Sequence, residues 1–222
     1  DPGDRPILSQ LYVRGREMRL CQELILGIGG VRALRALGIE PAVWHVNEGH
    51  SAFQVAERMR ELMEGGETLE EARRKVRAST VFTTHTPVPA GNETFECPLV
   101  EKYARAFSER MGIDLPDLMA LGRAYPHGEH QPFNLTALAI RFSGWVNGVS
   151  RLHGEVADQM WRHLFHERDG EEGSVHAITN GVHRATWLGH DVRTLIEERL
   201  GRDWQQHASD TEFWEEIGRA HV

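Results

Sequence analysis

The sequence predicts an α/β fold in which a parallel sheet is flanked by helices. Residues 41–46 and 80–84 are rich in β-branched and aromatic side chains, which is typical of buried strands. Each run ends in a polar turn, and the residues between the two runs carry helix-start signals. A strand, a helix and a second strand in this order form a βαβ unit, so we expect both strand ends at one edge of one sheet.

The composition is that of an ordinary globular protein with an acidic balance. The 222 residues are 40% hydrophobic, enough for one large or two small domains, and a formal net charge of −8 argues against a nucleic-acid partner. Cys21 and Cys97 are too few for a disulfide framework and fit a reducing compartment, so we expect a cytoplasmic protein. The longest apolar run, residues 24–31, is too short to span a membrane, and no secretory signal precedes it.

The two ends predict an internal piece of a longer protein. The chain starts at Asp1 rather than at a methionine. It stops at Val222, shortly after residues 209–212 signal the start of a helix.

The first helix is expected over residues 16–37, where apolar positions recur with a helical period and Gly38 provides a stop. Three glycines within residues 27–30 interrupt it. They do not form a dinucleotide-binding fingerprint, because no strand precedes them and Arg32 stands where the last glycine is needed. Close packing against another helix is the better explanation.

Capping signals define the helices that follow. Ser51 is expected to cap a helix to about residue 64, and Thr68 with Glu71 forms a capping box that opens a helix to residue 78. The remaining pattern predicts helices at 95–111 and 115–122, a loop at 124–132, a helix at 135–142 capped by Asn134, a glycine-interrupted crossover at 145–150, a helix at 152–167, a strand at 175–179 and a helix at 191–201.

The loop after residues 80–84 carries the first candidate site. His85, Asn92 and Glu93 follow the strand in a stiff, proline-containing segment. Ligands of open α/β sheets bind beyond the carboxyl ends of the strands, where the turn of residues 47–50 is also expected. The alternative is an ordinary surface loop after a core strand.

Two other kinds of chemistry were possible on the residue types alone. Histidine pairs occur at His127 and His130 and at His163 and His166, but no further ligand motif accompanies them, so we expect no metal.

A glycosidase pair is the second kind. Glu48 and Glu93 could serve as its acid and its nucleophile, provided that their two loops approach closely enough.

Four segments carry the strongest signal. They read HVNEGHSAF (45–53), TTHTPVPAGNETF (83–95), VNGVSRLHGE (146–155) and ITNGVH (178–183). Together they resemble the α-glucan (glycogen/maltodextrin) phosphorylase family, in its order and approximate spacing, and most closely its shorter bacterial type. The resemblance implies a GT-B architecture of two Rossmann-like halves. Residues 1–145 would end the N-terminal half, and 146–222 would form the crossover and the beginning of the C-terminal half.

The resemblance also implies an activity for the complete protein. This is the reversible, retaining phosphorolysis of an α-1,4-glucan, in which orthophosphate removes the terminal glucose as α-D-glucose 1-phosphate. Pyridoxal phosphate in this family is held on a lysine of the C-terminal half. Neither Lys75 nor Lys102 matches that lysine, so we expect no cofactor-binding residue in this chain. This chain alone should be inactive as a phosphorylase and show no absorbance of a protein-bound aldimine. Its oligomeric state stays open, and a homo-oligomer is one possibility.

Residue roles follow from the same resemblance. His85 matches the histidine that holds the 6-hydroxyl of the transferred glucose, with its carbonyl facing the developing oxocarbenium ion. Asn180 matches an asparagine that grips the same hydroxyl from the other half, while Asn147 and Val149 match a segment that walls this sugar. A purely structural role, in which Asn180 satisfies a turn, is the alternative.

The turn after the first strand matches a loop beside the anomeric carbon. It contributes Asn47, Glu48 and His50, of which Glu48 is the looser match because the family more often has aspartate and threonine there. The alternative for His50 is a helix cap. Glu93 carries over only as an acid that shapes the loop.

Two other functions stay open. A nucleotide-sugar glycosyltransferase such as a glycogen synthase shares the two-lobed design. A non-catalytic glucan-binding module would need exposed aromatic platforms, whereas we expect Trp161, Trp187 and Trp204 in the core.

Overall fold

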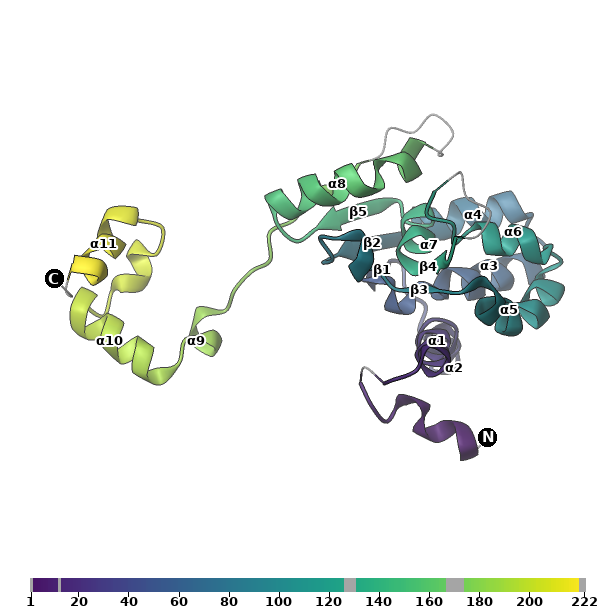
Figure 1. Cartoon of the computed structure of the whole chain (residues 1–222), viewed down its shortest axis with the longest axis horizontal. Coiled ribbons are helices and arrows are strands. Elements are labelled where there is room, and N and C mark those ends of the chain that lie inside the picture. Colours follow the sequence, from purple (N-terminus) through teal and green to yellow (C-terminus); the bar gives the residue numbers. More distant parts are fainter. Residues whose placement is uncertain (1, 12, 126–130, 167–173, 220–222) are drawn as a thin grey trace. The chain divides into compact units, whose positions relative to one another are not determined.

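The computed structural model describes residues 2–11, 13–125, 131–166 and 174–219 (Figure 1). They form two compact units, of which the first extends to Thr179 and the second begins at Asn180. The first unit contains the sheet and all of the candidate residues except Asn180.

A four-stranded parallel sheet organises the first unit. Its strands are β1 (Trp44–Asn47), β2 (Thr80–Thr84), β5 (Trp145–Gly148) and β6 (His176–Ala177), in the spatial order β1-β2-β5-β6. The predicted α/β fold with a parallel, helix-flanked sheet is therefore confirmed, and it is Rossmann-like.

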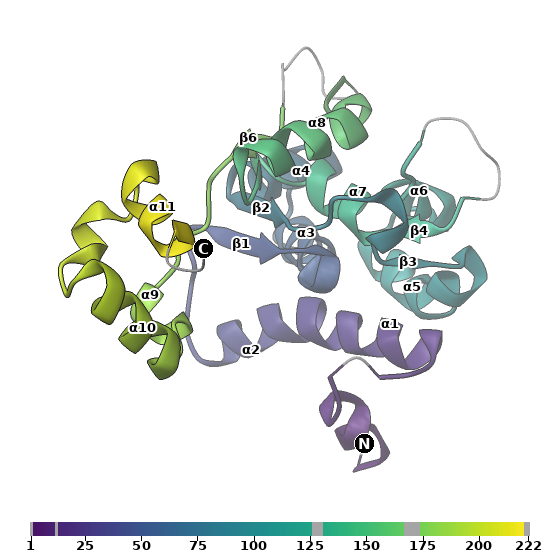
Figure 2. The ribbon, with the colours of Figure 1, turned by 60° about the vertical axis from the view of Figure 1, so that its left-hand side comes forward.

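The predicted first helix is present, with one irregular turn. Its parts are α1 (Arg16–Leu24), a π-helical turn (Ile25–Gly29) and α2 (Gly30–Ala36), and Figure 2 shows them as one continuous run. A Cβ on Gly27 would lie 2.8 Å from both Gln54 N and Phe53 Cβ, which confirms close packing as the reason for a glycine.

The helices between β1 and β2 test two capping predictions. The capping box of α4 (Leu69–Ala78) is confirmed, since Glu71 N–H donates to Thr68 Oγ1 (3.3 Å) and Thr68 N–H to Glu71 Oε2 (3.0 Å). The Ser51 cap is wrong, because Ser51 belongs to a separate 3-10 turn (Gly49–Ser51) that precedes α3 (Gln54–Glu64). The chain passes from β1 to α3 through this turn, and neither the turn nor α3 begins with a side-chain cap.

The segment between β2 and β5 is mostly helical. It contains α5 (Cys97–Met111), α6 (Leu115–Ala120) and α7 (Leu135–Arg141), with a short antiparallel pair formed by β3 (Thr94–Phe95) and β4 (Phe133–Asn134). The Asn134 cap is confirmed, because its Oδ1 accepts from Ala137 N–H at 2.9 Å. Further 3-10 turns span Pro2–Leu8 and Pro89–Gly91.

The predicted crossover at 145–150 is wrong, because its first four residues form strand β5. This strand pairs with β2 on one side and β6 on the other, and Val146 is buried in the core. The glycine of the pattern, Gly148, is the last residue of this strand, and α8 (Arg151–His166) begins after Val149 and Ser150. The division between the two compact units falls after Thr179.

The second unit is helical. It contains α9 (Arg184–Trp187), α10 (His190–Leu200), a 3-10 turn (Trp204–His207) and α11 (Thr211–Arg219). Trp204 is buried as predicted, and so is Trp161 in the first unit. The prediction for Trp187 is wrong, because α9 is too short to cover the indole and its side chain is 79% exposed.

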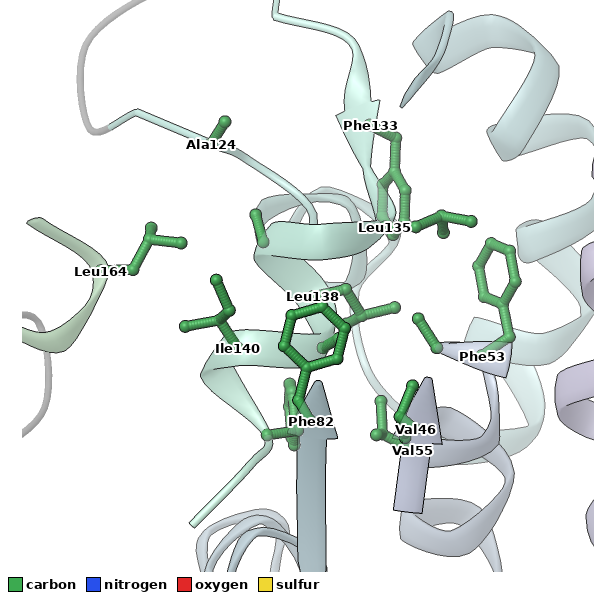
Figure 3. Packing of buried hydrophobic residues seen from close by; sticks show 14 of the residues in the cluster. Val46, Phe53, Val55, Phe82, Ala124, Phe133, Leu135, Leu138, Ile140 and Leu164 are labelled. Carbon is green, nitrogen blue, oxygen red and sulfur yellow. The ribbon is translucent and has the colours of Figure 1, made fainter. Parts of the chain in front are cut away.

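The core of the first unit lies between the sheet and its helices. Figure 3 shows Phe82 and Val46, from neighbouring strands, with Leu138 of α7 close to them. Leu164 of α8 belongs to the same cluster. Within the described ranges, no helix combines the length and the apolar character that crossing a bilayer requires.

We expect Gly148→Ala to lower the free energy of unfolding by about 1–3 kcal/mol, because overpacking a filled site forces atoms apart. A Cβ there would lie 2.6 Å from His153 Nδ1 and 3.0 Å from the backbone of Gly154. Gly181→Ala is the control, since nothing lies within 4 Å of a Cβ at that position. Urea denaturation measures both, and equal losses would contradict this packing.

Candidate functional site

The carboxyl ends of β1 and β2 lie side by side. The two strands pair in parallel, with Asn47 opposite Thr83, so the turn after β1 and the loop after β2 leave the sheet at the same edge. The structure therefore brings Asn47 and Glu48 together with His85, as the sequence predicted.

Glu48 joins the two strand ends. Its Oε1 accepts hydrogen bonds from the His85 N–H and from Thr86 Oγ1, the latter at 3.2 Å. Its backbone has φ 60° and ψ −176°, and among the described residues no other non-glycine residue has a positive φ. Such a conformation costs about 1–3 kcal/mol and occurs mainly where the surrounding structure requires it. The strained backbone aims the carboxylate at the neighbouring loop.

The side chains of His85 and Asn47 form the exposed part of this site. His85 Nε2 lies 2.7 Å from Asn47 Oδ1, and both residues are exposed at the rim of the sheet. An imidazole and an amide together offer donors and acceptors to a polar ligand.

Asn147 and Val149 lie beside this pair at the end of β5. Asn147 is buried, and its Oδ1 accepts from Thr83 Oγ1 at 3.1 Å. The Val149 N–H donates to His153 Nδ1 (3.3 Å) at the start of α8. Asn147 thus braces the strand ends with its side chain.

His50 points to α1 rather than to His85. Its Nδ1 lies 2.7 Å from an Arg19 guanidinium nitrogen and 3.1 Å from Glu23 Oε1. The hydrogen bond to the Glu23 carboxylate raises the pKa of the His50 imidazole above its usual value. The alternative of a helix cap is not supported, since neither the 3-10 turn nor α3 has a side-chain cap.

Glu93 is held by two arginines of α1. Its Oε1 lies 2.6 Å from Arg16 and its Oε2 3.3 Å from Arg19 Nε. Arg16, Asn92 and Glu93 line an adjacent cavity of about 490 Å³. Asn92 is buried, and its Oδ1 accepts from Thr136 Oγ1 at 2.9 Å.

Sequence reasoning missed Arg16 and Arg19. Their spacing on the helix is visible in the sequence, but their partners are not. Glu93 follows Arg16 by 77 residues and Arg19 by 74, and His50 follows Arg19 by 31. Asn180 belongs to the second unit, where it is exposed. His127 and His130 lie outside the described residues, and the described part of the chain contains no group of three or more potential metal ligands.

These features define a class of protein. A Rossmann-like sheet with polar side chains gathered at its carboxyl edge is a ligand-binding or catalytic α/β domain. Residues 13–218 match the carbohydrate phosphorylase family, and the chain belongs to that family.

Individual relatives are similar over nearly the whole chain. Maltodextrin phosphorylase of Thermococcus litoralis is 44% identical over 229 residues, covering 100% of this chain and 27% of the relative. Glycogen phosphorylase of Aquifex aeolicus is 35% identical over 216 residues, which cover 97% of this chain and 31% of the relative. Glycogen phosphorylase of Mycobacterium tuberculosis is 39% identical over 213 residues, which cover 90% of this chain and 24% of the relative. The chain thus spans less than a third of the length of these relatives.

Proposed function

We propose that this chain is part of an α-glucan phosphorylase. The complete protein would transfer the terminal glucose of an α-1,4-glucan to orthophosphate, releasing α-D-glucose 1-phosphate with retention, and reverse the reaction. The observation that carries the proposal is the Asn47–Glu48–His85 cluster at the strand ends of a member of this family. The two named activities among the relatives, on maltodextrin and on glycogen, support the substrate class.

Sugar hydroxyls both donate and accept hydrogen bonds, which suits the exposed pair of His85 and Asn47. In the proposed mechanism, His85 holds the 6-hydroxyl of the reacting glucose, and its backbone carbonyl faces the positive charge that develops at the anomeric carbon. Interactions that strengthen as this charge develops raise the rate. Glu48 holds the His85 backbone in place through the His85 N–H.

The other candidate residues take supporting or neighbouring roles. Asn147 and Val149 form the wall beside the sugar, with the Asn147 side chain directed to Thr83. His50 lines the turn next to the reacting carbon, and Glu93 shapes the loop. In the complete protein, we assign Asn180 a contact with a hydroxyl of the transferred glucose.

The architecture of the complete protein is part of the proposal. We assign this chain to the end of the N-terminal half and the start of the C-terminal half of a GT-B protein. Since β5 and β6 continue the sheet of β1 and β2, we move the end of the first half from residue 145 to Thr179. We also propose a cytoplasmic location, in keeping with the free thiols of Cys21 and Cys97.

Pyridoxal phosphate does not fit the residues of this chain. Lys75 and Lys102 are the two lysines of the sequence, and each is exposed on a helix in an ion pair, Lys75 with Glu67 and Lys102 with Glu17. Neither belongs to the strand-end cluster. We therefore propose that the complete protein binds its cofactor through other residues.

The test is a transfer assay on the complete protein. Incubated with maltodextrin and orthophosphate, it should form glucose 1-phosphate. It should transfer no glucose to maltodextrin from a labelled sugar nucleotide. Transfer from the sugar nucleotide without phosphorolysis would instead establish the synthase-like alternative.

A further inference from the structure

Arg19 is the point where α1 meets both loops of the candidate site. It is 14% exposed, and its guanidinium lies 2.6 Å from Glu23 Oε1, 2.7 Å from His50 Nδ1 and 3.3 Å from Glu93 Oε2. A fourth contact, to Gln22 Oε1, is 3.3 Å long. His50 belongs to the turn after β1 and Glu93 to the loop after β2, so one side chain contacts both.

The chemistry of the guanidinium suits this task. Its five N–H donors lie in one rigid plane, so it can hold several acceptors in a fixed arrangement. Here Nε donates to Glu93 and a terminal nitrogen donates to Glu23, and the same terminal nitrogen donates to His50 Nδ1 in the state in which that ring nitrogen carries no proton. Glu23 is only 1% exposed, and its carboxylate balances the positive charge of Arg19.

The two loops are thus joined at two places. Close to the sheet, Glu48 accepts from the His85 N–H, and on the α1 side Arg19 joins His50 to Glu93. Two further contacts close to the sheet, from Thr86 Oγ1 to Glu48 and between His85 Nε2 and Asn47 Oδ1, hold only the first residues of the loop after β2. The link through Arg19 acts at Glu93, further along the same loop.

We propose that Arg19 is a positioning residue for glucose transfer, which holds the loops carrying Asn47 and His85 in their productive arrangement. The inference rests on the proposed function of these loops. Arg19 itself does not touch the reacting sugar. Its contribution is geometric, because a misplacement of about 1 Å at a reacting centre can cost about 100-fold in rate.

Kinetics of the complete protein test the proposal. Arg19→Gln should lower kcat for phosphorolysis by about 10- to 100-fold, with the KM for maltodextrin nearly unchanged, because contacts made only in the transition state are lost. Arg19→Lys keeps the charge but not the planar fork, so it should restore kcat only in part.

Arg32→Gln is the matched control. Arg32 lies on the same helical run and pairs with the buried Glu57 at 2.8 Å, but its contact is with α3 and not with the strand-end loops. Glu57 keeps Arg60 as a second partner. We expect Arg32→Gln to lower stability while kcat stays at the wild-type value.

A second readout does not depend on activity. Amide hydrogen exchange at His85, whose N–H donates to Glu48, should become faster in Arg19→Gln and not in Arg32→Gln. The proposal would be overturned if Arg19→Gln changed neither the exchange rate at His85 nor kcat. It would also be overturned if the loss of kcat equalled the fraction of the variant protein that is unfolded under the assay conditions. If the wild type lacked phosphorolysis, the proposed function would fail, and the exchange measurement would still decide whether Arg19 holds the loop.

Discussion

His85→Ala in the complete protein should lower kcat for phosphorolysis by about 100-fold, the size of effect seen when one preorganised hydrogen-bond partner of a transition state is removed. The imidazole is exposed and its contact is Asn47 Oδ1, so the substitution leaves the core untouched. The link to Glu48 is made by the His85 backbone and survives in the variant. The loss should therefore appear in kcat without a fall in stability.

Initial rates of glucose 1-phosphate formation, with thermal unfolding measured in parallel, check this expectation. Lys75→Ala serves as the control, since Lys75 lies in the last turn of α4, which leads into the opposite, amino end of β2. It should retain the wild-type kcat. A His85→Ala enzyme with wild-type kcat would remove His85 from the proposed glucose contact.

Phe82→Ala should cost about 3–5 kcal/mol of the free energy of unfolding, because a large buried ring is lost and a cavity remains. Phe82 is 0% exposed in β2, which lies between β1 and β5, and it joins the core cluster with Val46 and Leu138 (Figure 3). Urea denaturation of the chain measures the loss.

Val88→Ala is the comparison, since Val88 follows the same strand and is 53% exposed. It should change stability by no more than about 0.5 kcal/mol. If Phe82→Ala does not fold, Phe82→Leu, with an expected loss of about 1 kcal/mol, gives a measurable value. Equal losses for Phe82→Leu and Val88→Ala would contradict the buried position of β2.

Local signals in the sequence were enough for much of the fold. The capping box of Thr68 and Glu71, the Asn134 cap and the stop at Gly38, where φ is +70°, all involve groups within a few residues of each other. The parallel pairing of β1 and β2 followed from the βαβ pattern. The cap predictions succeeded because their hydrogen bonds close locally, and the strand prediction succeeded because a βαβ unit places its two strands in one parallel sheet.

In the candidate site, too, some features followed from the sequence and others only from the tertiary structure. The sequence placed Asn47, Glu48 and His85 at adjoining strand ends, because parallel strands share one carboxyl edge. It did not reveal that Arg19 links His50 to Glu93, since these partners come from three different elements. Ion pairs of this kind depend on how distant segments pack.

The triplet Asn-Gly-Val occurs at 147–149 and again at 180–182. At the first occurrence, Gly148 is packed against α8 with no room for a Cβ, while at the second, Gly181 is surrounded by open space. By itself the sequence determined the parallel strand–helix pattern, the caps at Thr68 and Asn134, and the family resemblance. Only the tertiary structure decided that residues 145–148 form a central strand and which side chains brace the site, because space and ionic partners are set by residues far apart in the chain.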